Sequence, residues 1–229
     1  MPALLPHRQP ESPLDWFASE AGQGVLEVEA LAVARVLAGC PALPWAWFGV
    51  PGATPPDVPG GRGLLLRRTE HGFDGAIRCA LPLPLASESL GAVLVQHALD
   101  DGFELELLLG ECERVLAPGG TLWLATLNPW SPYRLRWARL GMRVRGPGRW
   151  QALLRRAGFA LDAVNVQWVG PHWRSAHGDA GVGPLDWPRA GLALSITKRT
   201  YAIVPPRPLR SLRWQGAGSV RAGHLRARR

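Results

Sequence analysis

Several kinds of residue are scarce in this chain of 229 residues. Lysine occurs once, at Lys198, beside 25 arginines. The three cysteines form no C-x-x-C pair, which argues against a disulfide framework or a zinc site and favours buried free thiols. No stretch approaches the roughly 20 consecutive apolar residues of a membrane-spanning helix, and the N-terminus lacks a basic region followed by an apolar one. We therefore expect a cytoplasmic protein that neither binds a metal nor enters a membrane.

Positive charge is in excess, and it is unevenly placed. The formal net charge is +8, yet residues 134–156 contain eight arginines and residues 205–229 contain seven, without one Asp or Glu in either segment. Two interpretations fit such runs, either a surface that contacts a polyanion such as nucleic acid or the solvated surface of an arginine-rich protein. The second is favoured because no interleaved aromatic platform and no nucleic-acid motif accompanies the arginines.

The apolar pattern alternates between helical and extended spacing along the chain. Helical spacing predicts helices over residues 24–37, 104–116 and 149–157. Short apolar runs predict strands at residues 45–50, 63–66, 76–79, 92–95, 121–127, 161–169 and 192–204. Strands that alternate with helices indicate an α/β fold with a doubly wound, mostly parallel sheet covered on both faces. We place this single domain at residues 21–204, after an irregular arm over residues 1–20 and before a basic tail over residues 205–229 that we expect to be disordered.

In an open α/β sheet, ligands bind outside the carboxyl ends of the strands, near the point where the strand order reverses. This rule selects short segments that directly follow the predicted strands. They are residues 49–52, Arg67, residues 79–81, Gln96 with His97, and residues 128–130.

Three segments resemble one known family. Residues 83–100, with Leu83-Pro84-Leu85 and the run from Ala92 to Asp100, are similar to the third and fourth strand region of the type-11 family of class I S-adenosylmethionine-dependent methyltransferases. Residues 111–120 resemble the signature of that family, a helix end and a Pro-Gly-Gly turn before strand five. Asn128-Pro129-Trp130-Ser131 is similar to a bacterial subgroup. The resemblance implies a Rossmann-like methyltransferase fold, S-adenosylmethionine as cofactor, and methyl transfer to an unidentified small-molecule acceptor.

The resemblance also implies roles for individual residues. The substrate-binding positions are Asn128, Trp130 and Tyr133, and His97 and Asn128 are the catalytic candidates. The cofactor-binding positions are Phe48, Gly49, Gly52, Cys79, Ala80, Leu81, Gln96 and His97. Each has an alternative, because His97 could simply bind backbone at a strand end, Asn128 could form a turn before proline, and the aromatic residues could belong to ordinary packing.

The sequence departs from the family where the cofactor is bound. Pro51 interrupts the glycine-rich loop and removes one N–H donor. At the predicted end of strand two stand Arg67 and Arg68, which can only donate, where the family has an acid that accepts the ribose hydroxyls. Glu70 and Asp74 are alternative acids from the adjacent loop.

These departures leave three interpretations open. The first is an active methyltransferase, since sulfonium methyl transfer depends chiefly on alignment of the reacting groups. The second is a catalytically inactive relative that acts as a scaffold or regulatory protein. The third is a nucleic-acid-associated protein that uses its basic segments.

Overall fold

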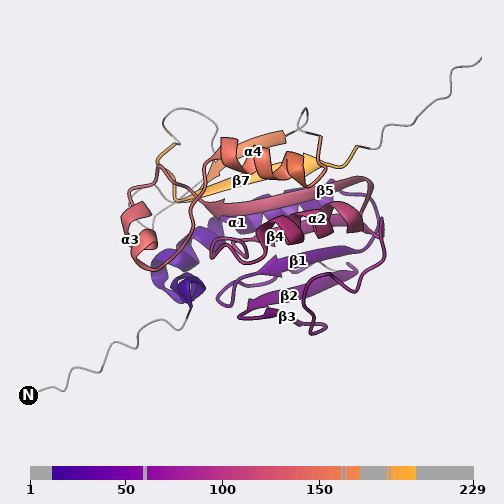
Figure 1. Ribbon diagram of the computed structural model, residues 1–229, viewed down its shortest axis with the longest axis horizontal. Coiled ribbons are helices and arrows are strands. Elements are labelled where there is room, and N and C mark those ends of the chain that lie inside the picture. Colours follow the sequence, from indigo (N-terminus) through magenta and orange to yellow (C-terminus); the bar gives the residue numbers. More distant parts are fainter. Residues whose placement is uncertain are drawn as a thin grey trace, which may run out of the picture.

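The computed structural model describes residues 12–58, 61–160, 162, 164–170, 185 and 187–199. In this part of the chain a seven-stranded sheet has the order β3-β2-β1-β4-β5-β7-β6 (Figure 1). The strands are β1 Trp45–Gly49, β2 Gly63–Thr69, β3 Gly72–Gly75, β4 Leu90–Gln96, β5 Leu116–Leu127, β6 Val164–Val169 and β7 Gly191–Thr197. The helices are η1 Pro13–Ala18, α1 Glu20–Ala38, α2 Leu105–Val115, α3 Arg134–Arg139 and α4 Pro147–Arg156.

The central strands β2, β1, β4 and β5 are parallel, whereas β3 at one edge and β7 near the other are antiparallel to their neighbours. In Figure 1, α2 and α4 lie in front of the sheet and α1 lies behind it. Each face buries its own apolar cluster, one around Leu108, Trp150 and Leu153 and the other around Val25, Trp47 and Trp123. The predicted fold class, an α/β sheet wound on both faces in a single domain, is therefore confirmed.

The way in which β1 is joined to β2 is unusual for two parallel strands. Parallel strands are usually joined through a crossover helix, but the described part of the connection over residues 50–62 contains none. Instead, the large apolar side chains of Trp45 and Trp47 on β1 pack on the face of the sheet that α1 covers.

Two of the predicted strands need correction. The second strand, expected to end at residue 66, continues to Thr69. The third, expected at residues 76–79, is wrong, because β3 lies at 72–75 and forms a hairpin with β2. The turn holds only Glu70 and His71, and it lacks the Asn-Gly type of sequence that usually identifies a two-residue hairpin.

The sequence predicts an irregular arm over residues 1–20, but the described part of this arm contains the helix η1. Ser12 caps η1 through a capping box with Asp15, and Pro13 occupies the first turn, where its missing N–H costs nothing. Leu14, Trp16 and Phe17 are buried, so this segment belongs to the core. The basic tail at 205–229 and residues 1–11 lie outside the described residues.

No helix among the described residues is both long and apolar enough to cross a membrane.

Replacing Phe17 by alanine tests whether η1 is part of the folded core. We expect Phe17→Ala to lower the free energy of unfolding by about 3–5 kcal/mol, because a fully buried aromatic side chain leaves a cavity. Leu31, which is exposed on α1, provides the control, and Leu31→Ala is expected to change stability by less than about 0.5 kcal/mol. Urea unfolding followed by circular dichroism measures both, and equal effects would contradict the assignment of η1 to the core.

Candidate functional site

The strand order reverses between β1 and β4, which are neighbours but lead to opposite edges of the sheet. Their carboxyl ends meet, and Gly49 at the end of β1 forms an isolated bridge with His97 after β4. The structure therefore brings together three of the predicted cofactor-binding residues, Gly49, Gln96 and His97.

His97 lies completely buried between two carboxylates. Its Nε2 is 2.8 Å from Oε1 of Glu29 on α1, and its Nδ1 is 2.7 Å from Oδ2 of Asp100. Burial alone would lower the pKa of the imidazole, but the charge of Glu29 and the hydrogen bonds to Asp100 and Glu29 raise it to about 10. The ring is consequently a cation at neutral pH, and neither ring nitrogen is free to accept a proton.

The same carboxylate of Glu29 extends the network to β1. Its Oε2 accepts a hydrogen bond of 2.8 Å from the amide of Gln96, whose oxygen accepts one of 3.0 Å from the indole N–H of Trp47. Glu29, Gln96 and Trp47 are all buried. Hydrogen bonds between buried polar groups thus connect helix α1, β4 and β1 beneath the surface.

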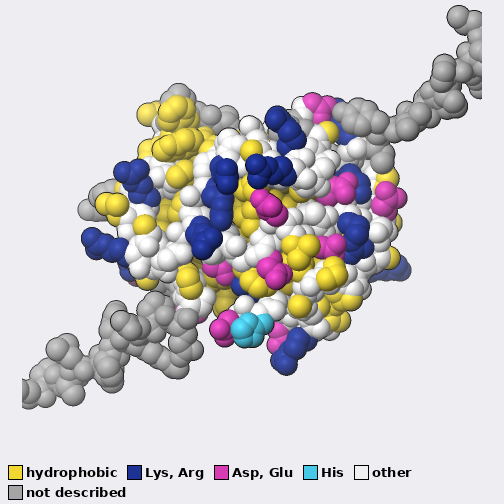
Figure 2. Space-filling view, viewed as in Figure 1, with side chains coloured by type: hydrophobic (Ala, Val, Ile, Leu, Met, Phe, Trp, Pro, Cys, Tyr) yellow, Lys and Arg dark blue, Asp and Glu magenta, His cyan; other side chains and the backbone are white. Residues whose placement is uncertain are grey.

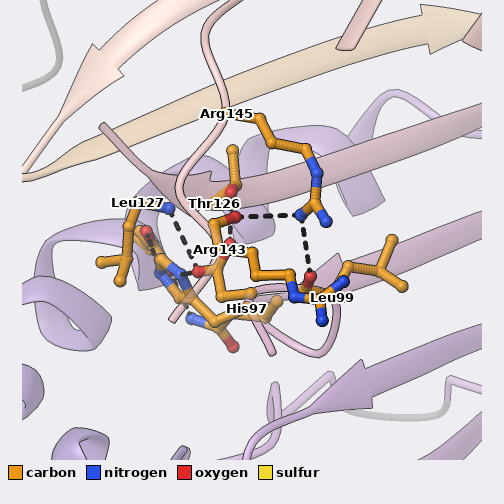
Figure 3. A network of polar contacts seen from close by, with 9 residues as sticks. His97, Leu99, Thr126, Leu127, Arg143 and Arg145 are labelled. Carbon is orange, nitrogen blue, oxygen red and sulfur yellow. Dashed lines mark hydrogen bonds and ion pairs between the residues drawn. The ribbon is translucent and has the colours of Figure 1, made fainter. Parts of the chain in front are cut away.

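Asp100 connects the network to β5 (Figure 3). Its carboxylate accepts hydrogen bonds from the hydroxyl of Thr126 and from the backbone N–H of Leu127. Behind it, the guanidinium of Arg145 donates to the carbonyls of Leu99 and Arg143, which holds the loop after β4 against the segment before α4. Every oxygen of the Asp100 carboxylate is used in this arrangement.

Side chains and helix η1 cover the edge where a cofactor was expected. The indole of Trp47 lies over Gly49, since a Cβ added to that glycine would come within 2.0 Å of the ring. The ring of Phe17 packs on His97 with centroids 4.4 Å apart. A Cβ at Gly52 would meet the backbone of Phe17 and Ala18 at 2.9 Å. Gly49 and His97 are buried, so a ligand can reach them only if η1 and the Trp47 indole move, whereas Gly52 is half-buried.

The other predicted cofactor residues lie apart from this edge. Phe48 is buried on the α2 side of β1 and packs against Phe73. Cys79 pairs its backbone with Phe73 at the β3 edge, where Leu81 is half-buried and Ala80 is exposed. Burial raises the pKa of the Cys79 thiol, so it is not an activated nucleophile.

The predicted substrate residues gather after β5. Asn128 is buried, and its amide donates to the carbonyls of Trp187 and Arg189 while its oxygen accepts from the N–H of Trp130. The Trp130 ring is 52% exposed and stacks on Trp187. Tyr133 is half-buried against Trp137. Asn128 therefore fixes the loop, and Trp130 and Trp187 together form the exposed aromatic surface.

A polar cavity of about 360 Å³ opens beside this covered edge, at the carboxyl ends of β1 and β2. It lies where the fold places ligands, but none of the predicted cofactor residues lines it. Its walls are Ser12, Pro13, Leu14, Asp15, Pro51, Arg68, Thr69, Glu70 and Asp101. The extension of β2 to Thr69 places Glu70, rather than Arg67, at the carboxyl end of this strand.

Arg68 is the buried cation of this cavity. Its guanidinium pairs with Asp101 at 3.1 Å and lies 3.5 Å from the centre of the Phe103 ring, but its Nε is buried without a hydrogen-bond partner among the described residues. Burial lowers the pKa of the guanidinium, and the charge of Asp101 partly offsets this effect. The cavity thus offers the carboxylates of Asp15, Glu70 and Asp101 beside a single buried guanidinium.

The described residues include no group of three or more His, Cys, Asp or Glu side chains that could hold a metal ion. His172 and His177 are not spaced in the sequence as metal ligands usually are, and both lie outside the described residues.

Comparison with known proteins shows what this fold is. No protein-family model matches the sequence, and no curated protein matches it. A solved methyltransferase of Thermotoga maritima, a possible histamine N-methyltransferase, aligns with a TM-score of 0.53 at 17% identity, over 80% of this chain and 93% of that one. A methyltransferase of Archaeoglobus fulgidus aligns with a TM-score of 0.51 at 14% identity, over 74% and 92%. Both are S-adenosylmethionine-dependent, and this chain has their Rossmann-like fold.

The buried imidazolium predicts how stability depends on pH. Because the pKa of His97 is raised from 6.5 to about 10 on folding, its contribution is complete below pH 6.5 and is lost as the pH rises toward 10. We expect the free energy of unfolding to fall as the pH rises from about 6.5 to about 8, with a slope approaching about 1.4 kcal/mol per pH unit. The window ends at about pH 8 because cysteine thiols of the unfolded chain titrate above it.

Urea unfolding at several pH values in this window measures the slope. His97→Gln should abolish it, and Glu29→Gln should reduce it if the first variant does not fold. The exposed His71 serves as control, because His71→Gln leaves the network intact. A wild-type slope that survives in His97→Gln would show that the imidazole is not held as a cation.

Proposed function

We propose that this protein is an S-adenosylmethionine-dependent methyltransferase that acts on a small-molecule acceptor, with the cofactor bound in the polar cavity. The single observation that carries this proposal is the position of Glu70, which follows β2 and lines a cavity beside the point where the strand order reverses. The likeness of the fold to two solved S-adenosylmethionine-dependent enzymes supports the choice of cofactor class.

The residues of the cavity suit the charges of the cofactor. S-Adenosylmethionine carries an ammonium, a sulfonium and a carboxylate, and it supplies an activated methyl group. The carboxylate of Glu70 would accept hydrogen bonds from the ribose hydroxyls, and Asp15 and Asp101 would offset the two positive groups. Arg68, which lines the cavity and pairs with Asp101, would supply the positive charge that faces the carboxylate. The predicted glycine loop does not fit in its covered state, so we assign binding to these cavity residues.

The acceptor would approach from the loop after β5. The Asn128 side chain is committed to backbone carbonyls, so it would position the loop instead of reacting. Trp130 and Tyr133 offer ring surface for contact with the acceptor. His97 has both nitrogens engaged, so the transfer would depend on alignment of the acceptor with the methyl group instead of a general base.

A catalytically inactive relative is the second candidate. The observation in its favour is the covered edge between β1 and β4, where Trp47 and Phe17 occupy the space above Gly49 and His97. In that case the fold would serve protein contacts as a scaffold or regulator.

Contact with a polyanion is a third candidate function, which the clustering of basic side chains favours (Figure 2). Figure 2 shows Lys and Arg side chains gathered over the part of this face where α3 and α4 lie. Of the eight arginines in residues 134–156, all but Arg145 are exposed, and one, Arg156, pairs with a carboxylate, that of Glu106. A polyanion held there would bind with a steep dependence on salt concentration.

Calorimetric titration with S-adenosylmethionine and S-adenosylhomocysteine tests the cofactor site. We expect saturable binding of both and a loss of about three- to tenfold in Glu70→Gln, because the Glu70 side chain is 87% exposed and solvent screens part of its hydrogen bonding to the ribose. Glu106, which is on α2 and away from the cavity, gives the matched control, and Glu106→Gln should bind like the wild type.

Absence of heat and of thermal stabilisation at millimolar ligand, in protein that is folded by circular dichroism, would sink the methyltransferase proposal and leave the inactive relative. Binding that Glu70→Gln does not weaken would instead place the cofactor outside this cavity.

A further inference from the structure

A second cavity lies between α1 and the β1–β2 connection. Its volume is about 380 Å³, within the range of sites that hold small organic molecules. We propose that it is a binding site for a compact apolar molecule that is neutral or positively charged. The proposal does not rest on the methyltransferase function, since this cavity shares no lining residue with the polar cavity.

The cavity results from the way in which β1 is joined to β2. A crossover helix would normally pack beside α1 on this face of the sheet. Here an irregular segment takes its place, and residues 54–58 of that segment form one wall while α1 forms the other. An irregular segment of this length does not fill the volume of a helix. Since protein interiors normally contain few voids larger than a water molecule, an open space of this size is a feature that a ligand can use.

The walls are mainly apolar and come from both segments. Leu26 and Val33 are buried in the stripe of α1 that faces the sheet, and Leu37 continues this stripe. The opposite wall consists of Pro55, Pro56 and Val58. Proline rings on one side and small or branched helix residues on the other give a wall with little side-chain freedom. Such a site loses little entropy when an apolar molecule binds.

The charge of the lining determines which molecules fit. Among the described residues of this lining, Glu27 and Asp57 are the ionisable ones, and none is Lys or Arg. Both carboxylates are exposed, so they act at the mouth of the cavity. In a protein with a net charge of +8, this is a local reversal of sign. An anionic ligand would be repelled, whereas an amine could keep its ammonium at the rim and bury its apolar part.

Gln96 supplies a directional polar group at the inner end. Its amide is buried and is oriented by the indole of Trp47 and the carboxylate of Glu29. A primary amide has two N–H donors and two acceptor sites, and these two bonds use one of each. The remaining N–H and lone pair can contact a polar atom of the ligand. The site therefore combines an apolar wall, an oriented amide and an acidic rim.

Three matched probes test this site in the full-length protein: 2-phenylethylamine, 2-phenylethanol and 3-phenylpropanoate. They share a phenyl ring and differ in the charge of the terminal group, which is positive, neutral and negative in turn. Calorimetric titration or thermal shift should give the order amine, then alcohol, then carboxylate, with the amine about fivefold tighter than the alcohol, as two partly screened carboxylates allow. The double variant Glu27→Gln and Asp57→Asn should remove this difference while the alcohol still binds.

Filling the cavity locates the binding. Ala34 lines the cavity on an exposed turn of α1, and Ala34→Trp should reduce the binding of the amine by at least about tenfold through steric exclusion. Ala38, exposed at the end of the same helix and outside the lining, gives the control Ala38→Trp. The proposal is overturned if none of the probes binds the folded wild type at millimolar concentration, if the carboxylate binds as tightly as the amine, or if Ala34→Trp binds like Ala38→Trp. Binding of S-adenosylmethionine should be unchanged in Ala34→Trp, which separates this outcome from that of the polar cavity.

Discussion

The buried cation of His97 between Glu29 and Asp100 is the interaction on which the arrangement of this molecule depends. Its members come from α1, from the loop after β4 and, through Thr126 and Leu127, from β5. A buried charge that loses one partner costs several kcal/mol, so these groups are tolerable only together. His97 also adopts a left-handed backbone with φ of 57°, which a non-glycine residue keeps only when its surroundings impose it. Docking of α1 and closure of the β4 loop therefore form one event.

This closure explains why the centre of the sheet edge is not open. Glu29 holds α1 against β4, and η1, which directly precedes α1, thereby packs Phe17 on the imidazole with the two rings tilted. On the other side, the Trp47 indole turns over Gly49 to reach Gln96. Ligand space is consequently displaced to the flanks, into one polar cavity at the end of β2 and one apolar cavity beside α1. The described part of the β1–β2 connection contains no crossover helix, which makes the second of these possible.

The class of fold could be predicted from the sequence because it depends on the period of apolar residues, which is strong in residues 104–127. The hairpin of β2 and β3 could not, since its two-residue turn of Glu70 and His71 carries no recognisable turn chemistry. The sequence names Glu70 and Asp74 as alternative acids, but without this hairpin it gives no reason to prefer Glu70, which directly follows β2. Glu29 left a usable signal, because it interrupts the buried stripe Val25, Ala32, Val33 of α1 and a buried acid needs a cationic partner. The covering of the glycine loop depends on tertiary packing, so the sequence carries no signal that predicts it.

The two cavities have a common electrostatic character that the composition conceals. Asp15, Glu70 and Asp101 surround one, Glu27 and Asp57 the other, while the arginines concentrate on α3, α4 and the segment between them. Concave sites focus the field of the charges that line them, so a protein of positive net charge can still attract cations locally. A sulfonium cofactor and an amine have this sign, and a phosphate or nucleic acid has the opposite one. Under these proposals, cationic ligands would occupy the cavities and an anionic partner would contact the separate α3–α4 face, so the two would not compete.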